Sequence, residues 1–140
     1  MDRVFLDANV LFSAAYSAEG PFLELWRRKG IRLLTSDYAI QEVKRNLAGK
    51  DRLKRLDQLI APMEIVPSCT AHLPLDALGG ENLPEKDRPI LAAAIHAAAT
   101  HLLTGDRKHF GNYFGRKIRG VLIQTPTQYR LSKSRGRRGT

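Results

Sequence analysis

Short, mainly apolar runs alternate along the chain with longer segments in which apolar residues recur every three or four positions. A short apolar run bounded by turn residues is typical of a strand buried on both faces, as in a parallel sheet. The spacing of three or four is typical of a helix with one buried side. The runs that predict strands are residues 4–6, 31–35, 63–66, 102–104 and 121–123.

Four segments between these runs have the helical spacing. Gly30 ends the first, since glycine is favoured just past a helix C-terminus. Ser36 or Asp37 caps the second, and Asp87 opens the fourth, where proline follows in the first turn. The apolar stripes fall within residues 22–26, 40–47, 53–60 and 91–98.

Strands that alternate with helices predict an α/β fold, with a mainly parallel five-stranded sheet covered by helices on both faces. One domain accounts for residues 1–131, and a chain of 140 residues is long enough to bury a core. Residues 68–86 contain prolines and glycines without a periodic apolar pattern, and they predict a loop. Residues 132–140 mix Lys and Arg with small residues, and they predict a basic, disordered tail.

Acidic residues stand where the predicted strands end and the predicted helices begin. Asp7 ends the first strand, Asp106 follows the fourth, Glu42 lies early in the helix after the second strand, and Asp87 begins the helix before the fourth. In a parallel sheet these positions meet outside the carboxyl edge. Carboxylates at such short separations repel one another unless a cation neutralises them. A site made only of oxygen ligands favours Mg²⁺ or Mn²⁺. Such a metal can activate water and stabilise charge on a phosphoryl group.

Each of these acids also has a structural explanation. Asp87 suits a helix N-cap, Asp106 suits a turn, and Glu42 suits a solvated helix face. Asp7 is harder to explain in this way, because an acid directly after an apolar strand has few structural roles. The predicted site therefore depends on the coincidence of all four acids at one edge of the sheet.

The charge of the chain favours a polyanionic partner. Lys and Arg total 23 against 14 Asp and Glu, which gives a net charge of +9. A phosphate backbone is the usual partner of such a protein, and an acidic membrane surface is the alternative. No apolar run approaches the roughly 18 residues of a membrane span, and no signal-peptide pattern is visible. The single cysteine, Cys69, rules out an internal disulfide and suits a cytoplasmic protein.

Four segments of the sequence resemble PIN-domain proteins, and the resemblance covers nearly all of residues 3–131. Taken in this order and spacing, the segments are typical of the family. It implies a three-layer α/β/α sandwich and an Mg²⁺- or Mn²⁺-dependent endonuclease that acts on RNA. The segments are FLDANVL at 5–11, TSDYAIQEV at 35–43, DRPILAAA at 87–94 and LTGDRKHF at 103–110.

The resemblance also implies which residues form the site. Supporting polar residues of the family fall on Asn9, which would orient Asp7 or a metal-bound water, and on Thr104. A turn or helix cap explains Asn9 equally well, and a strand position explains Thr104. The catalytic and metal-binding acids of the family fall on Asp7, Glu42, Asp87 and Asp106.

The sequence departs from the family just after the last acid. Many relatives have a further acid or polar residue there, where this chain has Arg107, Lys108 and His109, so the number of metal ions stays open. These basic residues suit either the RNA backbone or a solvated turn. The candidate RNA-binding residues are Arg107, Lys108, Arg135, Arg137 and Arg138.

The length and single-domain build resemble toxins of the VapC type, each of which is held inactive by a cognate antitoxin. That resemblance implies an antitoxin partner and, as is common in the family, a homodimer. Two alternatives stay open. A phosphatase of the haloacid-dehalogenase type has a strand-terminal Asp, but it needs a second Asp where this chain has Asn9. A non-catalytic RNA-binding protein would also account for the charge.

Overall fold

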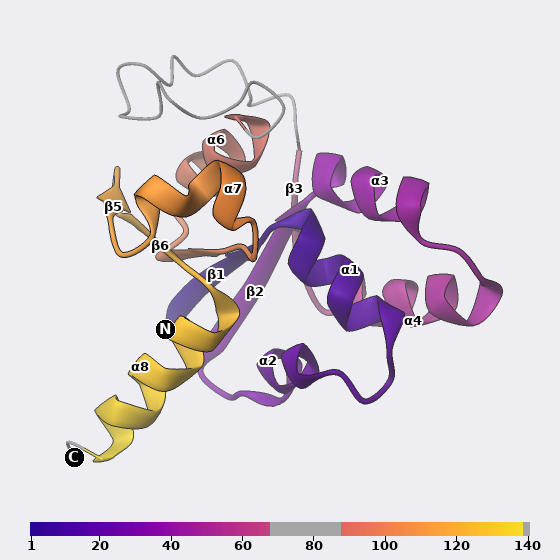
Figure 1. Ribbon diagram of the computed structural model, residues 1–140, viewed down its shortest axis with the longest axis horizontal. Helices are drawn as coiled ribbons and strands as arrows, with labels where there is room; N and C mark the ends of the chain where they lie inside the picture. Colours follow the sequence, from indigo (N-terminus) through magenta and orange to yellow (C-terminus); the bar gives the residue numbers. More distant parts are fainter. Residues whose placement is uncertain (68–87, 139–140) are drawn as a thin grey trace.

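The computed structural model describes residues 1–67 and 88–138, labelled as in Figure 1. The predicted loop over residues 68–86, with Cys69, and the predicted cap Asp87 lie outside the described residues. The strands are β1 (Asp2–Leu6), β2 (Ile31–Ser36), β3 (Glu64–Val66), β4 (His101–Leu103), β5 (Lys117–Ile118) and β6 (Val121–Gln124). The helices are α1 (Ala8–Tyr16), α2 (Glu24–Arg27), α3 (Asp37–Asn46), α4 (Lys50–Ile60), α6 (Arg88–His96), α7 (Arg107–Phe110) and α8 (Pro126–Arg138).

The strands form one sheet in the order β3-β2-β1-β4-β6-β5, and every neighbouring pair is parallel except β5 and β6. All five predicted strands are present, and β5 is a sixth that the sequence analysis missed. It has only two residues, too few to show a period. A tight turn joins it to β6 through Arg119 and Gly120, both with positive φ (50° and 87°), as in type I′ hairpins.

Helices cover the sheet on both sides, which confirms the expected three-layer α/β/α sandwich. Figure 1 shows α1, α2, α3 and α4 grouped to one side of the strands, with α6 and α7 on the other. The core between these layers contains the apolar residues of β1, β2, β4 and β6, of which Phe5, Leu34, Leu102 and Ile123 are fully buried. Within the described ranges, no helix combines the length and apolar character needed to cross a membrane.

The chain between β1 and β2 differs from the prediction. The sequence predicts a helical stretch around residues 22–26, whereas α1 occupies residues 8–16 and residues 22–26 divide between a 3₁₀ turn (Pro21–Leu23) and α2. Helix α1 buries Val10, Leu11, Ala14 and Ala15. Its sequence is apolar over most of its length, so its buried side does not stand out from a polar one. The glycine predicted to end this stretch, Gly30, has a φ of 81°, a left-handed conformation that suits it to the turn before β2.

The C-terminal segment that the structure describes is helical. Helix α8 continues through Arg138, and the predicted basic tail from residue 132 overlaps its second half. The helix is anchored at the amino edge of the sheet. The Tyr129 hydroxyl donates to Asp2 Oδ2 at 2.9 Å, and Lys133 Nζ lies 2.6 Å from the same oxygen. Tyr129 is fully buried, so α8 is docked before its basic end begins.

Candidate active site

Asp7 joins the first strand to the first helix. It follows β1 directly and is the N-cap of α1, because its Oδ1 accepts a hydrogen bond from Ala8 N at 2.7 Å. Its side chain is only 5% exposed. The backbone N–H of Asp7 also donates to Leu103 O at 3.0 Å, which ties the end of β1 to the end of β4. An acid fixed in this way contributes one carboxylate to the carboxyl edge of the sheet.

Thr104, buried at the end of β4, holds the second oxygen of that carboxylate. A hydroxyl can donate one hydrogen bond and accept two. The Thr104 hydroxyl donates to Asp7 Oδ2 at 2.8 Å, and it accepts from Asn9 Nδ2 at 3.2 Å and from Asp106 N at 3.1 Å. All three of its hydrogen-bonding positions are therefore used, and all of them connect predicted site residues.

Asn9 closes this network from the first turn of α1. Its Oδ1 accepts from Gly105 N at 3.0 Å, and its Nδ2 lies 3.4 Å from Asp7 Oδ2 in addition to its bond to Thr104. The carboxamide thus bridges α1 to the loop between β4 and α7. It orients the loop that carries Asp106, which follows Gly105 and precedes the first residue of α7.

Glu42 reaches the same edge from α3. Ser36, the last residue of β2, caps this helix by accepting from Ala39 N at 3.1 Å, so that the helix starts at the carboxyl edge as predicted. Thr35 supports the junction from β2, since its hydroxyl donates to Leu6 O at 2.9 Å. Glu42 lies in the second turn of α3. Its side chain is half-buried and lines the same cavity as Ala8 and Asn9 of α1.

Three of the four predicted acids line one cavity. Its volume is about 190 Å³, and it lies at the switch point of the sheet, between the carboxyl ends of β1 and β4. Asp87 lies outside the described residues. Among the residues that are described, no three Asp, Glu, His or Cys side chains already converge as a metal-binding group. This acidic cavity is lined by Asp7, Ala8, Asn9, Tyr38, Glu42, Ile90 and Asp106.

A comparison with protein-family models decides which family has this arrangement. The model of the PIN domain matches residues 3–108, which include every residue that lines the acidic cavity. The chain belongs to the PIN domain family.

Solved structures share the fold of this PIN domain. One is VapBC2 from Rickettsia felis bound to a DNA fragment from their promoter, with a TM-score of 0.65 and 19% identity over 88% of this chain and 98% of that one. Another is VapBC-1 from nontypeable Haemophilus influenzae, with a TM-score of 0.58 and 16% identity over 89% and 98%. No curated protein sequence matches the chain.

Three residues of the acidic cavity were not predicted to belong to a site, namely Ala8, which stands between Asp7 and Asn9, and two larger side chains, Tyr38 and Ile90. Tyr38 lies four residues before Glu42, so the two side chains share one face of α3. Ile90 follows Asp87 by three residues and is buried at the start of α6. Their spacing from a predicted acid, Glu42 for Tyr38 and Asp87 for Ile90, was the feature of the sequence that could have predicted their place in the cavity. An aromatic and an aliphatic side chain give the cavity apolar walls beside its carboxylates.

The predicted RNA-binding residues of the PIN domain divide into two places. Arg107 and Lys108 begin α7, directly after Asp106, and both are exposed beside the acidic cavity. The other three, Arg135, Arg137 and Arg138, belong to the last turns of α8. Figure 1 shows that this end of α8 lies far from the carboxyl ends of β1 and β4. The fold therefore does not bring the two basic groups together.

Proposed function

We propose that this PIN domain is a divalent-metal-dependent endoribonuclease. The observation that carries the proposal is the acidic cavity, where Asp7, Glu42 and Asp106 come from three separate elements to one space of about 190 Å³. Asp7 is held there almost fully buried, although burying a carboxylate is costly. The fourth acid in the proposal is Asp87, outside the described residues, since Ile90 three positions later lines the same cavity.

The donor chemistry of this cavity fits Mg²⁺ or Mn²⁺. Both are hard cations that bind carboxylate oxygens directly or through retained water, so a cavity with spaced carboxylates can hold one. Asp7, Glu42, Asp87 and Asp106 would be its ligands. When bound, such a metal lowers the pKa of coordinated water and stabilises charge on the phosphoryl oxygens.

The residues of the chain have distinct tasks in this proposal. Thr104 and Asn9 hold the Asp7 carboxylate in place, because a ligand fixed by outer hydrogen bonds binds with less loss of freedom. Arg107 and Lys108 bind the phosphates next to the cleaved bond. In the reaction the oxygen of water forms a bond to phosphorus, the bond to one ribose oxygen breaks, and that oxygen takes up a proton.

We propose further that the protein is a toxin of the VapC type with a cognate antitoxin, and that it forms a homodimer. The match to the PIN domain and the fold shared with two VapBC structures support the toxin and its antitoxin, whereas the homodimer rests on the resemblance to VapC-type toxins. Coexpression with the neighbouring reading frame and copurification of a small protein would test the antitoxin. Light scattering of the purified chain would test the dimer.

Cleavage of labelled single-stranded RNA tests the nuclease itself. Wild type should cut in Mg²⁺ or Mn²⁺ and stop in EDTA, whereas Asp7→Asn should not cut in either condition. The matched control is Asp57→Asn, which makes the same change on the exposed side of α4. Loss of cleavage in both variants, or in neither, would contradict the assignment of Asp7 to the active site. RNA binding without cleavage by the wild type would favour the non-catalytic alternative.

A further inference from the structure

A second pocket opens next to the acidic cavity, between α1 and α3. It has a volume of about 350 Å³, within the range that ordinarily binds small organic groups. It shares Ala8, Asn9 and Glu42 with the acidic cavity, so the two are adjacent. This Phe12 pocket is lined by Ala8, Asn9, Phe12, Ser13, Glu42, Val43 and Asn46.

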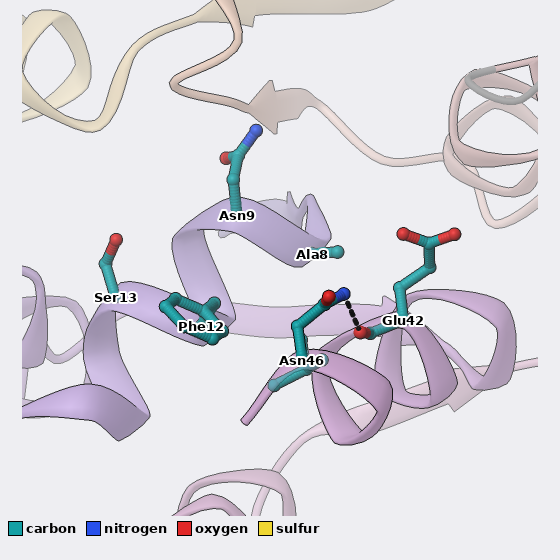
Figure 2. Close-up of a pocket in the computed structure, with 7 residues that line it drawn as sticks. Ala8, Asn9, Phe12, Ser13, Glu42 and Asn46 are labelled. Carbon is teal, nitrogen blue, oxygen red and sulfur yellow. Dashed lines mark hydrogen bonds between the residues drawn. The ribbon is translucent and has the colours of Figure 1, made fainter. Parts of the chain in front are cut away.

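The walls of the Phe12 pocket combine an aromatic ring with an amide. Figure 2 shows Phe12 of α1 and Asn46 of α3 on the two helices that border the pocket, with the Asn46 amide directed at the backbone carbonyl of Glu42, one helical turn earlier. Asn46 Nδ2 donates to that carbonyl at 2.9 Å, which fixes the orientation of the amide. An amide has a second N–H and a carbonyl oxygen, which can pair with the donor and acceptor edge of a nucleobase.

An aromatic and cationic track leads from Phe12 away from the acidic cavity. Tyr16 lies one turn further along α1, and the two ring centroids are 5.7 Å apart with a 31° tilt. The guanidinium of Arg52, from α4, lies over the Tyr16 ring at 3.7 Å. Tyr16 is 49% exposed, and Arg52 covers one face of its ring. Aromatic rings beside basic groups are what single-stranded nucleic acids bind, by base stacking and phosphate contact.

We propose that the Phe12 pocket binds the nucleobase next to the cleaved phosphate of a single-stranded RNA. The base stacks on Phe12, its edge pairs with Asn46, and the backbone continues toward Tyr16 and Arg52. This inference rests on the proposed nuclease function, because it places the phosphate in the acidic cavity. The shared wall of the two cavities and the positive charge of Arg52 favour RNA over an apolar protein segment as the occupant.

Cleavage kinetics test this subsite with a pair of matched variants. Phe12→Leu removes the ring but keeps an apolar side chain, and Phe22→Leu makes the same change at a partly buried site against the core, outside both cavities. Phe12→Leu should lower kcat/KM for single-stranded RNA by about 5- to 10-fold, as expected for a lost stacking contact, and Phe22→Leu should leave it unchanged.

Substrates with one abasic nucleotide make the test specific to a base. Wild type should cut RNA that is abasic next to the cleavage position about 5- to 10-fold less efficiently than intact RNA, and Phe12→Leu should cut the two equally. If wild type cuts both substrates equally well, the pocket binds no base. An apolar segment of a protein partner would then be its occupant.

Binding by an inactive variant separates this inference from the proposed function. In Asp7→Asn protein, 2-aminopurine placed at the same RNA position should lose fluorescence on binding, since stacking quenches it. The added Phe12→Leu change should restore most of that fluorescence. Quenching without any cleavage by the wild type would contradict the nuclease but keep the base subsite. Cleavage with no Phe12-dependent quenching would keep the nuclease and overturn the subsite.

Discussion

Strand β1 has an aspartate at each end, and the two have different surroundings. Asp2, at the amino edge of the sheet, is next to a cation, Lys133, and the Tyr129 hydroxyl. Asp7, at the carboxyl edge, accepts hydrogen bonds from Ala8 N and the Thr104 hydroxyl, and it shares a cavity with Glu42 and Asp106. The same residue type thus closes a structural ion pair at one end of the strand and faces other acids at the other end.

The pKa values at the amino edge agree with a structural role for Asp2. Burial alone would raise the pKa of Asp2, but hydrogen bonds from Lys133 and Tyr129 outweigh burial and lower that pKa. Burial and the hydrogen bond to Asp2 raise the pKa of Tyr129. Burial lowers the pKa of the adjacent His101 despite the attraction of Asp2, so His101 is neutral near pH 7. The two edges therefore differ in the neighbours of their aspartates, and the proposed function assigns a metal-binding role only to Asp7.

The sharpest test of this comparison exchanges each aspartate for asparagine. Asp7→Asn should lower the rate of RNA cleavage by at least about 100-fold, because it removes a metal ligand. Asp2→Asn should cut RNA at close to the wild-type rate. Single-turnover cleavage with the protein in saturating excess over RNA measures both. Similar losses in the two variants would mean that Asp7 has no special role.

A second test concerns the support of Asp7 by Thr104. Thr104→Val keeps the shape of the side chain but removes the hydroxyl, and the rate of cleavage should fall by about 10- to 100-fold. Thr104→Ser keeps the hydroxyl and should restore most of the rate. A thermal melt of each variant checks folding. Equal rates for Val and Ser would assign Thr104 a packing role alone.

A third test uses stability in place of activity. Wild type should melt several degrees higher in millimolar Mn²⁺ than in EDTA, because a ligand that binds only the native state stabilises it. Asp106→Asn should lose most of this shift, whereas Asp2→Asn should keep it. Differential scanning fluorimetry of the three proteins in both buffers is sufficient. An identical metal shift in all three would contradict a metal site at the carboxyl edge.

A fourth test addresses the pH dependence of the amino edge. The pKa of Asp2 is lowered in the folded protein, so its contribution to the free energy of unfolding is present above its unfolded pKa of about 3.9 and is lost as pH falls through the folded value. Asp2→Asn should cost roughly 1 kcal/mol near neutral pH, and its difference from wild type should shrink as pH falls below about 4. Urea unfolding at each pH measures this difference, and a constant difference would contradict the ion pair.

The smallest expected effect concerns the basic end of α8. Removal of residues 134–140 takes away three arginines and keeps Lys133, so the anchor on Asp2 stays intact. The slope of log RNA affinity against log salt should become shallower by up to about three units, one for each lost cation. The rate of cleavage at saturating RNA should not change, because this end lies far from the acidic cavity. An unchanged slope would mean that the arginines do not contact RNA.

The sequence predicted those parts of the molecule that a local pattern determines. Asp7 and Asp106 were found because parallel strands end at one edge, and Glu42 because a capped helix begins there. The Phe12 pocket could not be predicted, since it depends on how α1 packs against α3. Helix α8 was not predicted because its anchor, the contact of Tyr129 and Lys133 with Asp2, joins residues that lie far apart in the sequence.

The Thr104 hydroxyl has a consequence for when the protein can become active. It bonds to Asp7 across 97 residues of sequence, so the first proposed metal ligand is set only after β4 has been synthesised and paired with β1. A nascent chain from which only β1 to β3 have emerged contains Asp7 and Glu42 but lacks Thr104, Gly105 and Asp106. In the proposed nuclease, the metal ligands therefore come together only after residues up to Asp106 have left the ribosome.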